Sequence, residues 1–161
     1  MISLKRLSIL ITGLVFVGGF FIVNLFVNRD THDQTVYKKG LGQVTVYKSP
    51  SCGCCVGYTR FLKQDGYVVS IEETTDMNSV KQAHNIPSSM QSCHTAIIGD
   101  YFVEGHIPLE VVDKLLAEKP NLDGIALPGM PAGSPGMPGI KSEEFIIYGL
   151  KDGQVSEYTR I

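Results

Sequence analysis

The chain has 161 residues, of which 43% are hydrophobic and 19% are charged, a size and composition that suit one globular domain with appended segments. The formal net charge of -2 gives no electrostatic basis for binding nucleic acid, so we expect no nucleic-acid partner. Three of the four cysteines, Cys52, Cys54 and Cys55, lie within four positions, which argues against a scaffold built on many disulfides.

The N-terminus carries Lys5 and Arg6 ahead of an uncharged apolar run over residues 7–27, long enough to span a bilayer as a helix. The positive flank predicts that the chain after this run lies outside the cytoplasm. A cleaved signal peptide is the alternative, although the run exceeds the ~7–15 residues of a signal-peptide core and no small-x-small cleavage site follows it. We expect a membrane anchor or signal segment over residues 1–27 and a polar linker over residues 28–43. Either reading places the cysteines in an oxidising compartment.

The pattern from residue 44 to residue 161 predicts one α/β domain. Strands are expected at 44–48 and 67–73, helices at 53–64, 76–84 and 108–119, and hairpins at 95–105 and 144–160. Up to residue 119, the order is β-α-β-α-β-β-α, which is that of a thioredoxin-like fold.

The first loop of such a fold carries its reactive cysteines, and here that loop reads "SPSCGCC". Cys52 and Cys55 have the C-x-x-C separation, and Cys54 is an additional thiol between them. The following helix directs its first free N–H groups toward these sulfurs, which favours the thiolate. A low thiol pKa serves nucleophilic attack and metal binding alike.

The hairpin over residues 95–105 has a two-residue turn at 99–100. Counting pairs outward from this turn places Cys93 opposite His106, and facing side chains project from the same side of a sheet. We therefore expect Cys93 and His106 to converge. The start of this strand lies against the cysteine loop in a thioredoxin-like fold, so the sequence predicts a cluster of thiols with a histidine.

His94 presents a conflict, because regular alternation sends it to the face opposite Cys93 and His106. If the strand begins only at Thr95, His94 can instead turn toward the thiols. His94 stands where thioredoxins carry a cis-proline that binds the substrate peptide. We therefore expect this position to have lost peptide binding and to supply a nitrogen ligand instead.

The loop over residues 126–141 contains the triplet Pro-Gly-Met twice, ending at Met130 and at Met137. Its prolines and glycines exclude a helix or an interior strand, so we expect it to wrap over the surface. The two methionines are candidate thioether ligands for a soft ion such as Cu(I). Packing of an irregular loop against the core explains them equally well.

Cysteine-rich sites with histidine suit Zn(II), Cu(I) and iron–sulfur clusters. Zinc sites usually separate two cysteine pairs by a longer span, whereas three clustered cysteines with one remote cysteine suit the bridging of several Cu(I) ions. Adjacent Cys54 and Cys55 do not easily chelate one tetrahedral ion together, which also favours bridging.

The motifs "SPSCGCC", "QSCHTA", "VEGHIP" and "LPGMPAGSPGM", in this order, resemble those of the CopG-type exported copper-resistance proteins. The resemblance implies a periplasmic, thioredoxin-like protein that binds copper, as Cu(I) or Cu(II), through its cysteines. It also implies contact with other exported copper-handling proteins, while residues 7–27 would anchor the chain in the inner membrane. The expected metal ligands are Cys52, Cys54, Cys55, Cys93, His94, His106, Met130 and Met137.

Two other functions stay open. A thiol-disulfide oxidoreductase would use Cys52 as the attacking thiolate and Cys55 as the resolving thiol. An anchored interaction module would use its cysteines only as a structural staple, but a disulfide that closes so short a loop restrains the unfolded chain little.

Overall fold

The computed structural model describes residues 42–161. The predicted anchor over residues 7–27 and nearly all of the predicted linker lie outside the described residues. Within residues 42–161, no helix has the length and apolar character needed to cross a membrane.

The order of the first seven main elements confirms the predicted succession β-α-β-α-β-β-α. They are followed by β5, which was not predicted because three residues are too few to show an alternating pattern. The elements are β1 (Gln43–Lys48), α2 (Gly53–Gln64), β2 (Val68–Glu73), α3 (Met77–Ala83), the 3₁₀ turn η1 (Ser88–Met90), β3 (His94–Ile98), β4 (Tyr101–Glu104), α4 (Leu109–Glu118), β5 (Gly124–Ala126), β6 (Ile146–Lys151) and β7 (Gln154–Arg160).

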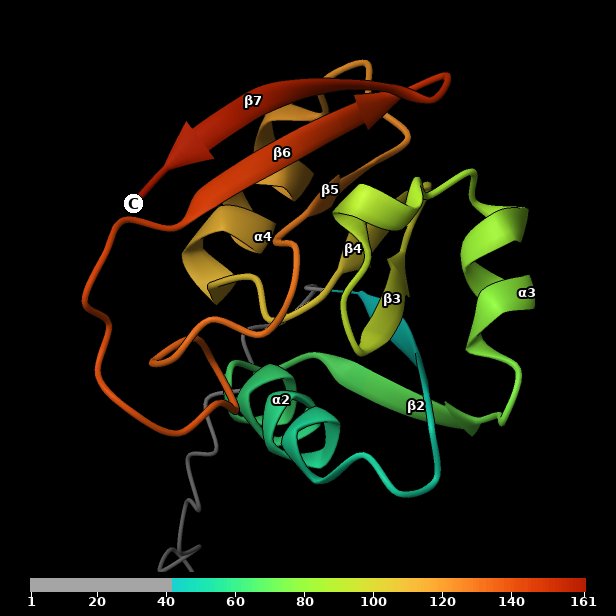
Figure 1. Cartoon of the computed structure of the whole chain (residues 1–161), viewed down its shortest axis with the longest axis vertical. Helices are drawn as coiled ribbons and strands as arrows, with labels where there is room; N and C mark the ends of the chain where they lie inside the picture. The colour runs from blue at the N-terminus through green and yellow to red at the C-terminus, as the bar shows by residue number, and fades with distance from the viewer. Residues whose placement is uncertain (1–41) are drawn as a thin grey trace, which may run out of the picture. The chain divides into compact units, whose positions relative to one another are not determined.

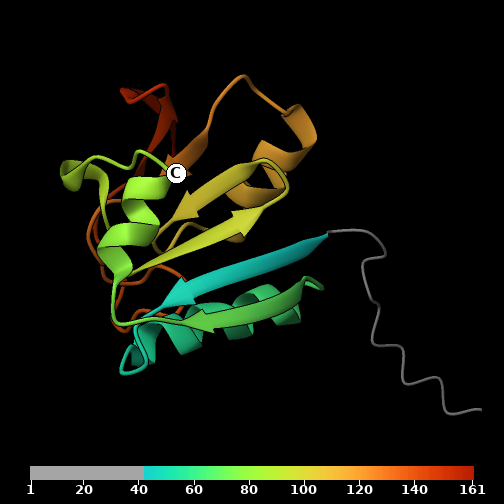
Figure 2. The same ribbon diagram turned by 90° about the vertical axis from the view of Figure 1, so that its right-hand side faces the viewer.

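The strands form one seven-stranded sheet in the order β2-β1-β3-β4-β5-β6-β7. Strand β1 runs parallel to β2 and antiparallel to β3, and β3 runs antiparallel to β4 (Figures 1 and 2). The predicted C-terminal hairpin is confirmed as β6 and β7, and it extends the sheet at the edge opposite β2.

Helices cover both faces of this sheet. Residues of α2 and α4 share the larger core cluster with alternate residues of β1, β3 and β4, whereas α3 and the segment after it pack on the other face. Period-two alternation therefore decides which helix each strand residue meets. The larger cluster includes Val44, Val46, Tyr58, Leu62, Ala96, Ile98, Val103, Val112 and Leu115, and the smaller one includes Ile86, Phe102, Ala126 and Leu150.

The predicted register of the first hairpin is confirmed. Ile98 pairs with Tyr101, and the ladder continues outward to Thr95 with Glu104. Beyond the regular ladder, the Gly105 N–H donates to the His94 carbonyl at 3.1 Å, so the pairing persists by one more step.

In α3, Met77 and Val80 are only half-buried and Ala83 is exposed, although the three lie along one face of the helix. The buried side chain of this helix is instead Lys81, which is 4% exposed. Helical spacing alone allows either face of α3 to pack against the sheet. The face that carries Lys81 is the buried one, and there Lys81 forms an ion pair with Glu104.

Candidate metal centre

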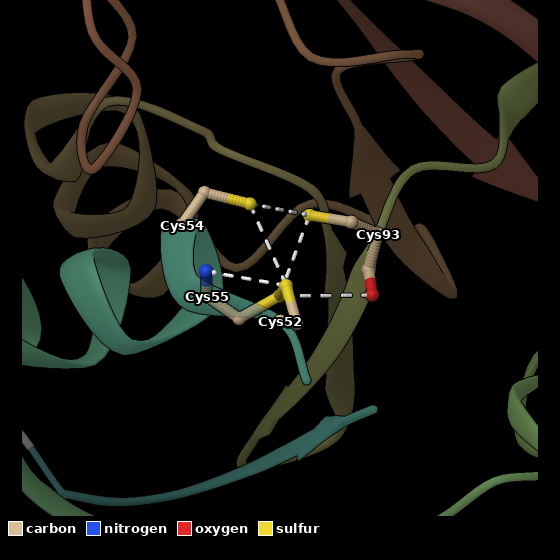
Figure 3. A group of neighbouring side chains, drawn as sticks. All are labelled: Cys52, Cys54, Cys55 and Cys93. Carbon is tan, nitrogen blue, oxygen red and sulfur yellow. Dashed lines mark hydrogen bonds between the residues drawn. A yellow bond between two sulfur atoms is a disulfide. The ribbon is translucent and has the colours of Figure 1, made fainter. Parts of the chain in front are cut away.

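The cysteine loop ends at the N-terminus of α2, where Cys52 is the N-cap residue. The Cys55 N–H donates to the Cys52 sulfur at 3.3 Å, so a thiol fills the role that a serine or aspartate oxygen usually has. Cys52 and Cys55 form a disulfide, while Cys54 and Cys93 are free thiols. Figure 3 shows the four sulfurs gathered between the start of α2 and the chain that leads into β3.

Cys93 is the residue that links the other cysteines of the site to its two histidines. Its Sγ lies 3.5 Å from the Cys55 Sγ, 3.8 Å from the Cys54 Sγ and 3.0 Å from the His106 Nε2. The His94 Nδ1 lies 3.4 Å from the same sulfur. Two ligand groups therefore share Cys93, one made of four sulfurs and one made of Cys93 with the two imidazoles.

The convergence of Cys93 and His106 follows the predicted register, but the expected conflict at His94 is resolved differently. Strand β3 begins at His94, not at Thr95, and His94 lies on the α2 face together with Ala96. It is Cys93 that lies outside the strand, in a bend. Alternation does not constrain a residue in a bend, so the Cys93 sulfur turns toward the same side as both imidazoles.

The loop between β5 and β6 reaches α2 before it returns to the sheet (Figure 1). We call residues 128–141 of this loop the strap. The Pro135 carbonyl of the strap lies 2.7 Å from the His106 Nδ1, and a carbonyl only accepts, so Nδ1 carries the proton. The Nε2 lone pair of His106 is then directed at the Cys93 sulfur, the orientation that a ligating histidine needs.

Gly136 lets the strap approach this closely. Its φ is +84°, and a Cβ built there would lie 2.5 Å from the Tyr58 nitrogen and 2.9 Å from the Cys54 carbonyl oxygen. A Cβ on Gly57 of the helix would likewise meet the Gly136 backbone at 3.0 Å. The strap and α2 therefore touch backbone to backbone at a pair of glycines beside the cysteine loop.

Burial sets the protonation of the site. It raises the pKa of the Cys93 thiol to about 12, and the neighbouring Cys54 adds to the shift. Burial lowers the pKa of His106 and lowers that of His94 well below its usual range, with His106 and Lys81 contributing at His94. Both imidazoles are thus neutral near pH 7, which leaves a nitrogen lone pair on each for a metal ion.

Tyr58 of α2 packs against both imidazoles, with ring centroids 4.6 Å from His94 and 5.7 Å from His106. Its hydroxyl donates to the Ile107 carbonyl at 3.1 Å, and burial raises the pKa of this hydroxyl. The His94 Nε2, which is buried, has no hydrogen-bond partner among the described residues. An unpaired buried nitrogen costs about 1–3 kcal/mol, so this atom suits a position that a ligand fills.

The two methionines lie in different surroundings. Met130 is 52% exposed, which argues against packing as its role. Met137 is half-buried and follows Gly136, where the strap contacts α2. The first triplet also approaches the site, because the Ser92 hydroxyl donates to the Gly129 carbonyl. Their part as ligands stays a prediction.

The donor set fits a soft or borderline metal ion. Thiolates and neutral imidazoles select Cu(I) and Zn(II) over hard ions such as Mg²⁺. With the disulfide closed, two of the four sulfurs are bonded to each other, so a site that uses all four requires prior reduction.

Sequence reasoning did not identify two supports of the site, namely Tyr58 as the contact of both imidazoles and the buried pair of Lys81 with Glu104. The lysine has a signal in the sequence, because Met77, Lys81 and His84 also follow helical spacing. The tyrosine has none, since its contacts depend on how α2 packs across the sheet.

The chain is similar to one described protein family and to two solved structures. A family described as "Protein of unknown function, DUF411" matches residues 90–137, a range that contains Cys93, both site histidines and both Pro-Gly-Met triplets. The solved structure of "Copper resistance protein copG- Form 2" is 39% identical to the chain, with a TM-score of 0.69 over 74% of this chain and 97% of that one. "Copper resistance protein copG- Form 1" is 38% identical, with a TM-score of 0.69 over 76% of this chain and 98% of that one. No curated protein matches the chain.

Proposed function

Because the chain belongs to the CopG-type family of copper-resistance proteins, we propose that it binds copper and takes part in copper resistance or homeostasis. The observation that carries the proposal is the position of the Cys93 sulfur, within 3.8 Å of two other sulfurs and two imidazole nitrogens. A thiolate with these neighbours can bridge more than one soft ion.

The proposed cargo is Cu(I), held by the four cysteines with His94 and His106. The adjacency of Cys54 and Cys55 favours a cluster of several ions over a single tetrahedral ion. Met130 and Met137 are proposed as additional thioether donors from the strap. Cycling between Cu(I) and Cu(II) is part of the proposal, and electron paramagnetic resonance of the loaded protein after mild oxidation tests it.

The decisive experiment is an anaerobic Cu(I) titration of the full-length, fully reduced chain in competition with a chelator, followed by metal analysis. Tight uptake of several ions per chain, abolished by Cys52→Ser, is the expected result. Saturation at one ion per chain would refute the cluster, and no uptake in competition would refute the copper function.

We also propose that the elements from β1 to α4 form a thioredoxin-like core. The sheet order β2-β1-β3-β4, with β1 and β2 parallel and the other pairs antiparallel, supports this assignment. The disulfide at the first turn of α2 supports a second candidate function, thiol-disulfide exchange. In that reaction the reduced Cys52 attacks a substrate disulfide, and Cys55 resolves the mixed disulfide, forming the Cys52–Cys55 bond and releasing the reduced substrate.

The two functions make different demands on Cys54. If the chain is an exchange enzyme, a variant with Cys54, Met130 and Met137 replaced should still reduce or oxidise a protein disulfide. If it is a copper site, Cys54→Ser should bind fewer copper ions per chain.

For location, we propose a periplasmic domain that residues 7–27 anchor in the inner membrane. The support is the sequence alone, namely the uncharged run behind Lys5 and Arg6. Fractionation of cells that express the full chain tests this proposal. Recovery of a shortened chain in the soluble periplasmic fraction would favour the cleaved signal peptide instead.

A further inference from the structure

A buried ion pair lies on the face of the sheet opposite Tyr58 and the two imidazoles. The Lys81 ammonium of α3 contacts the Glu104 carboxylate at the end of β4, and the two side chains are 5% and 0% exposed. Removing two charges from water costs several kcal/mol per ion, and apolar residues of the same volume often stabilise a core at least as well. Stability alone therefore does not account for this pair.

The other contacts of the carboxylate suggest what it does. Its Oε1 also accepts the Ser92 N–H at 2.7 Å, and its Oε2 accepts the Thr95 hydroxyl at 2.6 Å. Ser92 and Thr95 are the residues immediately before and after the pair Cys93 and His94. The Glu104 carboxylate therefore accepts hydrogen bonds from the residues on both sides of Cys93 and His94, two candidate ligands.

The hydrogen bond from the Ser92 N–H to Glu104 restrains a part of the chain that the β3–β4 ladder does not hold. Cys93 lies in the bend that precedes β3, outside the regular ladder, whereas Thr95 pairs with Glu104 within it. The Ser92 hydroxyl reaches the Gly129 carbonyl of the strap, and a Cβ on Gly105 would lie 2.7 Å from that hydroxyl oxygen. The bend is therefore closely confined, and the Ser92 N–H bond to Glu104 ties it to the sheet.

We propose that Glu104, paired with Lys81, is a positioning residue that fixes the bend and so holds the Cys93 thiol and the His94 imidazole in place for copper. This inference rests on the proposed copper function. Lys81 supplies the counter-charge, and it also donates to the Thr95 hydroxyl at 3.3 Å. An ionised carboxylate accepts all of these bonds without a proton that would need its own acceptor.

Two double variants of the full-length chain separate positioning from simple stability. Lys81→Met with Glu104→Gln removes both charges but keeps a carbonyl oxygen for the Ser92 N–H. Lys81→Met with Glu104→Leu removes the charges and the acceptor together. The glutamine form is thus the matched control for the leucine form, and urea unfolding reports the stability of each.

The expected result is a Cu(I) affinity at least tenfold weaker in the leucine form than in the glutamine form, in line with the ~10–100-fold effect of losing a partner that orients a ligand. Glu118→Gln, which breaks the exposed pair with Lys114, should leave the affinity within about twofold. Equal affinities in the two double variants, or losses that follow only their stabilities, would overturn the inference.

A measurement without metal separates this inference from the copper function itself. In a Cys54→Ser background with the Cys52–Cys55 disulfide closed, alkylation reports on Cys93 alone. Release of the bend should make Cys93 react several-fold faster in the leucine form than in the glutamine form. Absence of Cu(I) uptake by the parent chain would refute the copper function. Equal alkylation rates of Cys93 in the leucine and glutamine forms would refute the positioning role, whatever the outcome for copper.

A third variant serves if the leucine form does not fold. Thr95→Val removes the hydrogen bond from the Thr95 hydroxyl to Glu104, and it keeps both the ion pair and the side-chain volume. It should weaken Cu(I) binding several-fold, and an unchanged affinity would count against the proposal.

Discussion

The contact between the strap and α2 gives a sharp prediction, because the two Pro-Gly-Met triplets supply a matched pair of glycines. Gly129 and Gly136 both have positive φ, at +71° and +84°. A Cβ on Gly129 meets nothing within 4 Å, whereas one on Gly136 would lie 2.5 Å from the Tyr58 nitrogen. Replacing each with alanine therefore imposes the same backbone strain and a different steric result.

The strain of a left-handed alanine is about 1–2 kcal/mol, so Gly129→Ala should lower the free energy of unfolding by about that amount. Gly136→Ala adds a clash with the backbone of α2, which cannot yield as a flexible side chain does. The strap must then lift, and His106 loses the Pro135 carbonyl. A buried donor left unpaired costs about 1–3 kcal/mol more.

Copper binding should separate the two variants more clearly than stability does. When the strap lifts, nothing holds the His106 proton on Nδ1, so the Nε2 lone pair is no longer fixed toward Cys93. We expect Gly136→Ala to weaken Cu(I) binding by about 10–100-fold, and Gly129→Ala to leave it within about twofold.

The assay is chelator competition on the reduced chain, with urea unfolding of the same samples. If Gly136→Ala binds Cu(I) as tightly as Gly129→Ala does, the strap does not support the metal centre and the reasoning is refuted.

Three further predictions concern the same centre. With the disulfide closed and Cys54 replaced by serine, Cys93 should be alkylated near pH 7 more slowly than an ordinary thiol, because burial is the largest cause of its raised pKa and persists without Cys54. The full shift from 9.0 to about 12 would cut the thiolate about 1,000-fold, of which greater nucleophilicity restores about half on a logarithmic scale, so about 30-fold is the upper bound for the slowing in this variant. A rate equal to that of a free peptide thiol would contradict the burial argument. Because the folded state holds this proton more tightly than the unfolded state, its stabilising contribution is complete below about pH 9 and is lost as the pH rises through the raised pKa of the folded state. With the disulfide closed, the urea midpoint of the Cys54→Ser chain should therefore fall above pH 9 more steeply than that of the chain that also carries Cys93→Ser. Tyr58→Phe should lower the free energy of unfolding by about 1–3 kcal/mol, because it leaves the Ile107 carbonyl unpaired, while keeping the copper stoichiometry; loss of stoichiometry in that variant, which retains the ring, would show that the hydroxyl has a direct role.

Local signals in the sequence determined the longer helices and strands and one decisive register, but not the three-residue strand β5. The two-residue turn at residues 99–100 fixed the pairing of β3 with β4, because a hairpin of known turn length has only one register. That register brought Cys93 opposite His106 before any tertiary contact was considered. The start of α2 at the cysteine loop likewise followed from its spacing and flanking residues.

The tertiary structure decided what depends on contacts between distant segments. His94 joins the site because the bend falls at Cys93, and the sequence does not mark a shift of one residue at the end of a strand. The role of Gly136 depends on the strap crossing α2, and the burial of Lys81 depends on a carboxylate that β4 presents on the face of the sheet where α3 lies. Periodicity in the sequence assigns each residue to one face of its own helix or strand. Which faces pack against each other depends on how all the helices and strands fit together.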